Sequence, residues 1–230
     1  MSSERNFLKP LALAVLSFLF ISLTACGGGS DGSSGIVTST TTTTDASLLD
    51  TIEALTPTYL SAEEEQSLIF MREEEKLARD VYQFLYGIWA ENIFLNIAES
   101  EQRHTDAVLA LIEKYSLPDP AAGNAPGEFQ DQNLQGLYDI LIARGQASLI
   151  DALIVGAQIE DLDINDLNLQ LQIADNADVI LVYNSLLEGS QNHLRAFISQ
   201  LTALGFEYVP EYISQELFDA IINSPAETGP

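Results

Sequence analysis

Glu101 and His104 stand three residues apart on a face that is otherwise apolar. Steps of three and four residues through this segment give the apolar series Phe94, Ile97, Val108, Leu111 and Tyr115. This is the spacing of the inward side of an amphipathic helix. A lone buried charge costs several kcal/mol or is neutralised, so a carboxylate and an imidazole on a core face need a partner. A metal ion is one such partner.

Three further apolar series are interrupted in the same way. The series through residues 68–85 contains Glu75, the series through 150–171 contains Glu160, and the series through 179–197 contains Ser190 and His193. Both histidines of the chain therefore fall on inward faces. Because a helix rises about 1.5 Å per residue, the four interruptions lie at similar heights when counted from the short connections. The four interruptions are therefore expected to meet near mid-height, which random surface charge would rarely produce.

Four long amphipathic helices are needed to position these side chains. The apolar spacing predicts them over residues 61–86, 92–116, 147–173 and 177–204. Ser61 and Glu64 have the spacing of a capping box at the first helix, and Gly87 is expected to end it. Short helices are predicted over residues 47–55, 133–144 and 215–222. The fold class is therefore all-α, and the long link between the second and third long helices suits a parallel pair in a four-helix bundle.

The opposite side of the first long helix is charged. It carries Arg72, Glu73, Lys76, Arg79 and Asp80. Charges on the side of a helix away from its apolar series are ordinarily solvated. We therefore expect this side to be exposed and Arg79 to form a surface ion pair.

The residues around the predicted ligands resemble a known family. Residues 75–82, together with the Glu101-x-x-His104 pair, resemble rubrerythrin and other ferritin-like carboxylate proteins, and residues 61–204 are similar to the bacterial family called domain of unknown function 2202. The resemblance implies an antiparallel ferritin-like bundle holding two iron or manganese ions. Its ligands would be one glutamate from each of two helices and a Glu-x-x-His pair from each of the others. Glu75 and Glu160 correspond to the single glutamates, and Glu101 with His104 to the first pair.

The second pair departs from the family pattern. His193 matches the histidine, but Ser190 stands where a glutamate is expected. Asp163, three residues after Glu160, is a weaker candidate ligand that would replace it, and Glu74 is weaker still. The departure leaves a dinuclear, a single-metal and a vestigial site open. Two nearby glycines and one tyrosine also have two interpretations each, ordinary packing or support of the site: Gly156, Gly189 and Tyr82.

The beginning of the chain indicates export. Residues 1–25 have the layout of a secretory signal peptide. Residues 23–26 resemble a bacterial lipobox, which predicts that Cys26 is lipidated and anchors the protein to a membrane. The resemblance implies the bacterial cell envelope, with the outer membrane favoured in a Gram-negative cell because Gly27 follows the cysteine. The expected organisation is a tether over 26–45, a lead-in helix over 46–60, the bundle over 61–205 and a tail over 206–230 that packs on the bundle.

Composition and resemblance together limit the functions. The net charge of −25 excludes nucleic acid as a partner, because it repels phosphate. The favoured function is an iron or manganese oxidoreductase acting on peroxide or oxygen. Cys26 is the only cysteine, so electrons would come from an external donor. A metal-binding lipoprotein without turnover remains open, as does a metal-free interaction protein using Phe206, Tyr208 and Tyr212.

Overall fold

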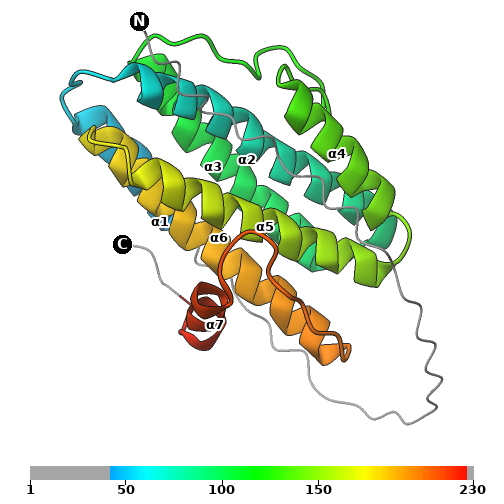
Figure 1. The fold of residues 1–230 in the computed structure, drawn as a ribbon. Coiled ribbons are helices and arrows are strands. Elements are labelled where there is room, and N and C mark those ends of the chain that lie inside the picture. Colours follow the sequence, from blue (N-terminus) through cyan, green and yellow to red (C-terminus); the bar gives the residue numbers. More distant parts are fainter. Residues whose placement is uncertain (1–41, 227–230) are drawn as a thin grey trace, which may run out of the picture. The chain divides into compact units, whose positions relative to one another are not determined.

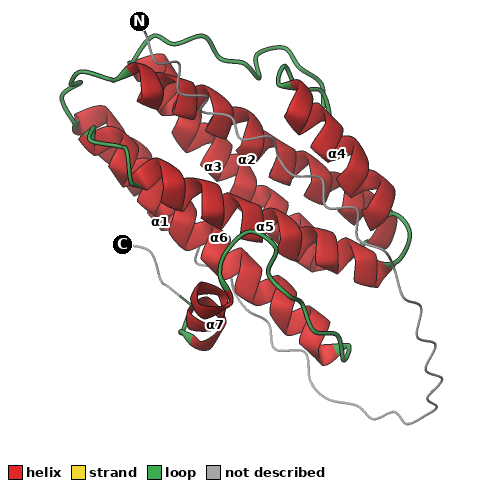
Figure 2. Ribbon diagram, in the orientation of Figure 1, coloured by secondary structure: helices red, strands yellow, loops and turns green. Residues whose placement is uncertain are grey.

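This computed structural model describes residues 42–226 of the chain. This part contains seven α-helices, joined by turns and irregular segments, and no strand (Figures 1 and 2). They are α1 (Thr42–Ala54), α2 (Ala62–Trp89), α3 (Asn92–Lys114), α4 (Gln132–Gly145), α5 (Leu149–Leu171), α6 (Ala177–Ala203) and α7 (Gln215–Asn223). The prediction of an all-α fold is confirmed. None of these helices has both the length and the apolar run that crossing a membrane requires. The predicted signal peptide and Cys26 lie outside the described residues.

The four long helices α2, α3, α5 and α6 pack side by side. α2 contacts α3 and α5, and α6 contacts the same two helices. Glu64, near the start of α2, accepts hydrogen bonds from the backbone N–H groups of Asp175 and Asn176, which precede α6. Trp89, at the other end of α2, donates to the carbonyl of Gly145, just before α5. α5 is therefore antiparallel to α2 and runs in the same direction as α3, so the α3–α5 link crosses the length of the helices.

Helix ends follow local chemistry. The capping box at Ser61 is present, because its Oγ accepts from the N–H of Glu64 at 3.2 Å and the Glu64 carboxylate accepts from the N–H of Ser61 at 2.9 Å. Gly87 does not end α2, contrary to the prediction. An isolated glycine inside a helix costs only about 1 kcal/mol, and the helix continues until Ala90 adopts a left-handed φ of 53°. α1 also begins earlier than predicted, at Thr42.

The charged side of α2 is buried, so the prediction that it is exposed is wrong. Arg72, Glu73, Lys76 and Asp80 are 9%, 3%, 3% and 1% exposed. α4 packs against both α2 and α5 (Figure 1), and the link that precedes α4 bonds to these charges. The amphipathic spacing of α2 could not predict this burial, because the segments that cover its charged side, α4 and the link before it, are distant in sequence.

Asp80 is the centre of the buried charges. Its carboxylate accepts from Lys76 Nζ at 2.6 Å, from Arg79 Nη2 at 2.7 Å and from the backbone N–H of Gly127 at 2.8 Å. Lys76 also donates to the carbonyl of Ala125 at 3.0 Å. Arg79 therefore pairs within this network instead of forming the predicted surface pair. These contacts hold the irregular link of residues 115–131 against the middle of α2.

A second acid of α2, Glu73, lies about two turns before Asp80 and also bonds to the link. The Glu73 carboxylate accepts from the backbone N–H groups of Gln130 at 2.5 Å and Asp131 at 2.9 Å. Arg72 pairs with Asp119 of the same link at 3.1 Å. The three contacts hold the two ends of the link against one face of α2, which gives a structural role to charges expected to be solvated.

Residues of the C-terminal tail bond to two of the long helices. Asp161 of α5 accepts from the hydroxyl of Tyr208 and the backbone N–H of Ile213, both at 2.9 Å. Arg195 of α6 donates to the carbonyl of Ile221 in α7 at 2.8 Å. Tail residues are thus fastened to two helices.

Replacing Asp80 with alanine should destabilise the protein by about 3–5 kcal/mol, because it leaves the buried Lys76 ammonium without its carboxylate. Urea unfolding at neutral pH measures the change. Asp106→Ala is the matched control, since Asp106 is exposed and its carboxylate accepts a hydrogen bond from the neutral side chain of Gln102; it should change stability by less than about 0.5 kcal/mol. Equal effects of the two variants would contradict the structural role of Asp80.

Candidate metal centre

A polar layer divides the core of the long helices. One apolar cluster includes Tyr82, Phe94 and Phe197, and another includes Leu68 and Tyr183. Between them lie the five predicted ligands, each at most 8% exposed: Glu75, Glu101, His104, Glu160 and His193. α2 and α5 contribute one glutamate each, α3 the Glu101–His104 pair and α6 one histidine. The apolar series therefore continues above and below a single ionisable layer.

Glu101 lies at the centre of this layer. Its Oε2 is 2.8 Å from His104 Nδ1, and its Oε1 is 2.7 Å from His193 Nδ1. Glu75 Oε2 approaches His104 Nδ1 at 3.2 Å, and Glu160 Oε2 approaches His193 Nδ1 at 3.5 Å. The five residues thus form two triads that share Glu101, and in each triad one ligand atom per residue lies within 4.8 Å of the others.

The triads have the donor atoms of a metal site. Ligands about 2.1 Å from one ion lie about 3 Å from each other in an octahedral arrangement, close to the separations seen around both Nδ1 atoms. Glu75 Oε1 is buried without a hydrogen-bond partner, and the 2.7 Å contact of Glu101 Oε1 with His193 Nδ1 lacks the geometry of a hydrogen bond. Buried polar atoms are nearly always satisfied. A cation between the groups would satisfy these atoms, so the residues fit a metal.

Asp163 and Ser190 lie beside the triads. Ser190 Oγ donates to Asp163 Oδ2, while Asp163 Oδ1 is buried without a partner. Burial, together with the carboxylates of Glu75 and Glu160, raises the pKa of Asp163 well above its ordinary value. Asp163 is in neither triad. The structure nevertheless places its carboxylate against Ser190, the residue of α6 at which the ferritin-like pattern has a glutamate.

Tyr82, Gly189 and Gly156 support the layer or its surroundings. The Tyr82 hydroxyl donates to Glu160 Oε1 at 2.5 Å. A Cβ on Gly189 would overlap the imidazole of His104, and a Cβ on Gly156 would overlap the ring of Phe197. Gly189 therefore lets α6 approach a predicted ligand, while Gly156 serves packing next to the layer.

The ionisable groups shift each other's pKa values. Burial raises the pKa of Glu75 to about 7 although His104 opposes it. Burial disfavours charge on Glu101 as well, but His193 and His104 outweigh it and hold its pKa below the ordinary value. Burial lowers the pKa of His193, yet Glu101 and Glu160 raise it overall to about 9. Without metal, the imidazoles thus carry protons that neutralise the carboxylates.

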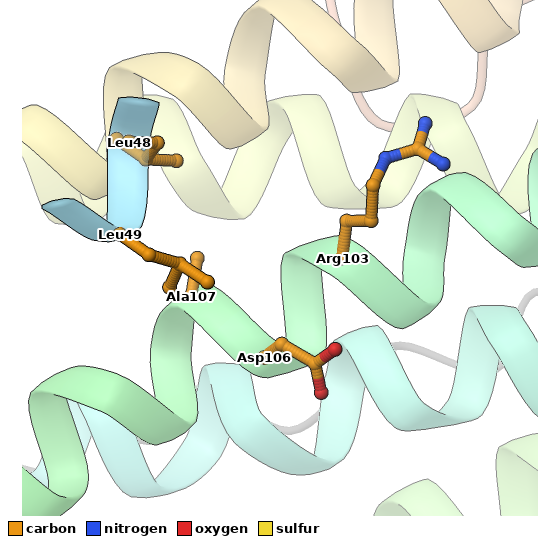
Figure 3. A pocket seen from close by; sticks show the side chains of 5 residues that line it. All are labelled: Leu48, Leu49, Arg103, Asp106 and Ala107. Atoms are coloured by element: carbon orange, nitrogen blue, oxygen red, sulfur yellow. The ribbon is translucent and has the colours of Figure 1, made fainter. Parts of the chain in front are cut away.

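A surface hollow lies away from this layer. It is formed between α1 and α3 and lined by Leu48, Leu49, Arg103, Asp106 and Ala107 (Figure 3). None of the five triad residues lines it. The hollow therefore gives no direct access to the centre.

Comparison with known proteins gives a family and a relative. A protein-family model described as "Uncharacterized protein domain (DUF2202)" matches residues 64–225. The chain is 50% identical over 182 residues to the uncharacterized protein MJ0754 of the archaeon Methanocaldococcus jannaschii, covering 79% of this chain and 98% of that protein. The crystal structure of hypothetical protein MJ0754 matches with a TM-score of 0.75, covering 76% of this chain and 99% of that one.

Gly189→Ala should displace the His104 ring, because the new methyl group would occupy its place. We expect Mn²⁺ affinity to fall about 10–100-fold, the range typical of changes that misplace a ligand, as measured by calorimetric titration. Gly136→Ala is the control, since a Cβ there meets no atom within 4 Å. An unchanged affinity in the Gly189 variant would argue against His104 as a ligand.

Cation binding should tighten as pH rises. A cation and a proton compete for His193 Nδ1, whose pKa is about 9 in the metal-free protein. Mn²⁺ affinity should therefore increase between pH 6.5 and about 9, by up to about tenfold per unit for each proton displaced. Titrations in buffers of different ionisation enthalpy measure both the affinity and the protons released. Binding without proton release would contradict the assignment of the imidazoles.

Proposed function

The chain belongs to the DUF2202 family, and from this premise we propose that it is a ferritin-like carboxylate protein holding two iron or manganese ions in its core. The observation that carries the proposal is Glu101, whose two carboxylate oxygens face different histidines. A carboxylate in this position is suited to bridge two cations.

Each cation would have its own ligands besides the shared one. Glu75 and His104 would hold the first with Glu101, and Glu160 and His193 would hold the second with it. Mixed carboxylate and imidazole donors suit iron and manganese. Asp163, with its free oxygen, would complete the centre from α5.

The helix arrangement supports the ferritin-like part of the proposal. Ferritin-like bundles have one long crossover between parallel helices and draw ligands from all four. Here α3 and α5 run in the same direction and are joined by the long link containing α4, and all four long helices contribute to the polar layer.

We propose that the centre reduces peroxide or oxygen. A bound pair of redox-active ions supplies the electrons for such a reaction. The protein's own groups keep the layer dry and hold Glu160 in place through the Tyr82 hydroxyl. Since Cys26 is the only cysteine, the chain lacks the thiolates that hold an iron–sulfur centre, and an external partner would restore the electrons.

A metal-holding protein without turnover is the second candidate. Ser190 favours it, because the ferritin-like pattern has the glutamate of the second Glu-x-x-His pair there. The metal-free interaction hypothesis has less support: Tyr208 bonds to Asp161 and is only partly exposed, which leaves Phe206 as the exposed aromatic residue of the proposed surface.

Metal content tests the proposal. The compact unit of residues 39–230, purified after growth with iron and manganese, should hold about two ions per chain. The Glu101→Gln variant should hold almost none, whereas Glu75→Gln and Glu160→Gln should each keep about one, because only Glu101 belongs to both triads.

The His104→Ala/His193→Ala double variant should also lose both ions. Mass spectrometry of the metals measures content, and circular dichroism checks that each variant folds. No tightly bound metal in the parent protein after reconstitution would overturn the proposal. Metal without reduction of peroxide or oxygen would select the second candidate.

A further inference from the structure

Two acidic side chains beside the centre take no part in the triads. Glu74 of α2 is adjacent in sequence to Glu75, and Asp166 of α5 lies one helical turn beyond Asp163. Glu74 is 4% exposed, whereas Asp166 is only partly buried. Acidic groups thus follow one another from near the surface to the polar layer.

Glu74 lacks the partners that other buried acids of α2 possess. Neither of its carboxylate oxygens meets a hydrogen-bond donor. Glu73 accepts two backbone N–H groups, and Asp80 accepts Lys76. Burying a charge without compensation costs several kcal/mol, so Glu74 requires either a proton or a cation.

The surroundings of Glu74 favour a cation ligand. The charged groups that act on it most strongly are the carboxylates of Asp166, Asp163 and Glu75. Asp163 Oδ1 is a third buried oxygen without a hydrogen-bond partner. Carboxylate oxygens are the ligands that hard divalent cations prefer.

We propose that Glu74 and Asp166 form a loading subsite that passes divalent cations from solvent to Asp163 and the paired centre. The inference rests on the proposed function, since it needs a metal centre to serve. Asp166 would collect the cation at the surface, and Glu74 would release it to Asp163 and the other ligands of the centre. The negative potential of such a series raises the rate at which cations arrive.

A shared proton is the competing explanation. Burial and the facing carboxylates raise the pKa of Glu74 well above its ordinary value, so a neutral Glu74 bonded to Asp166 would also be stable. That arrangement has no role in metal uptake. The two explanations therefore differ in loading rate and not in the final metal content.

Uptake of Mn²⁺ by the purified metal-free protein tests the subsite. Rapid mixing followed by loss of the free-ion electron paramagnetic resonance signal gives the rate, and metal analysis after equilibration gives the content. Asp166→Asn and Glu74→Gln should each load about tenfold or more slowly and reach the parent content. Glu188→Gln is the control, because it removes one charge from α6 at a similar height without touching the acidic series; it should load at the parent rate.

Three results would overturn the subsite. Parent loading rates in both variants would leave the shared proton as the role of Glu74. Reduced final content in folded variants would place these acids in the centre itself. Equal slowing by Glu188→Gln would show that the loading rate depends on the overall charge and not on Glu74 and Asp166. Absence of Mn²⁺ binding to the parent protein is a different outcome, because it removes the proposed function as well.

Discussion

The arrangement of this protein depends on burying several ionisable groups in one layer. Glu101 is the group on which the layer relies, because both histidines lie against its two oxygens. Removing that carboxylate would leave two buried imidazoles with weaker partners, and each of the four long helices contributes at least one side chain that faces it or its neighbours. Helix packing above and below is apolar and tolerant. The polar layer is not, because its charges must compensate one another within a few ångströms.

The buried charges of α2 serve a separate purpose on the opposite side of the helix. The link between α3 and α5 has irregular backbone whose N–H and carbonyl groups need partners. Glu73, Lys76 and Asp80 provide them, so the link lies against α2 without secondary structure of its own before α4. Charged residues suit this role because hydrogen bonds to charged groups are stronger than those between neutral groups.

Helical spacing was sufficient to predict most of the inward faces. Glu75, Glu101 and His193 were recognisable because a single polar residue interrupts an otherwise apolar series, and all three are buried. The spacing did not predict the burial of Lys76, because the segment that covers it is distant in sequence. The glycine at position 87 did not end α2, because one glycine is only a weak stop signal. The contact between Ser190 and Asp163 joins two helices. The sequence suggested that Asp163 replaces the glutamate missing at position 190, but it could not show that the Asp163 carboxylate contacts Ser190.

Three consecutive glutamates of α2 point in three directions. Successive residues of a helix are rotated by about 100°, so Glu73 meets the link, Glu74 meets α5 and Glu75 meets His104. The orientation of α2 about its own axis is therefore shared by all three contacts. A rotation of α2 that improved one of these contacts would therefore disturb the other two.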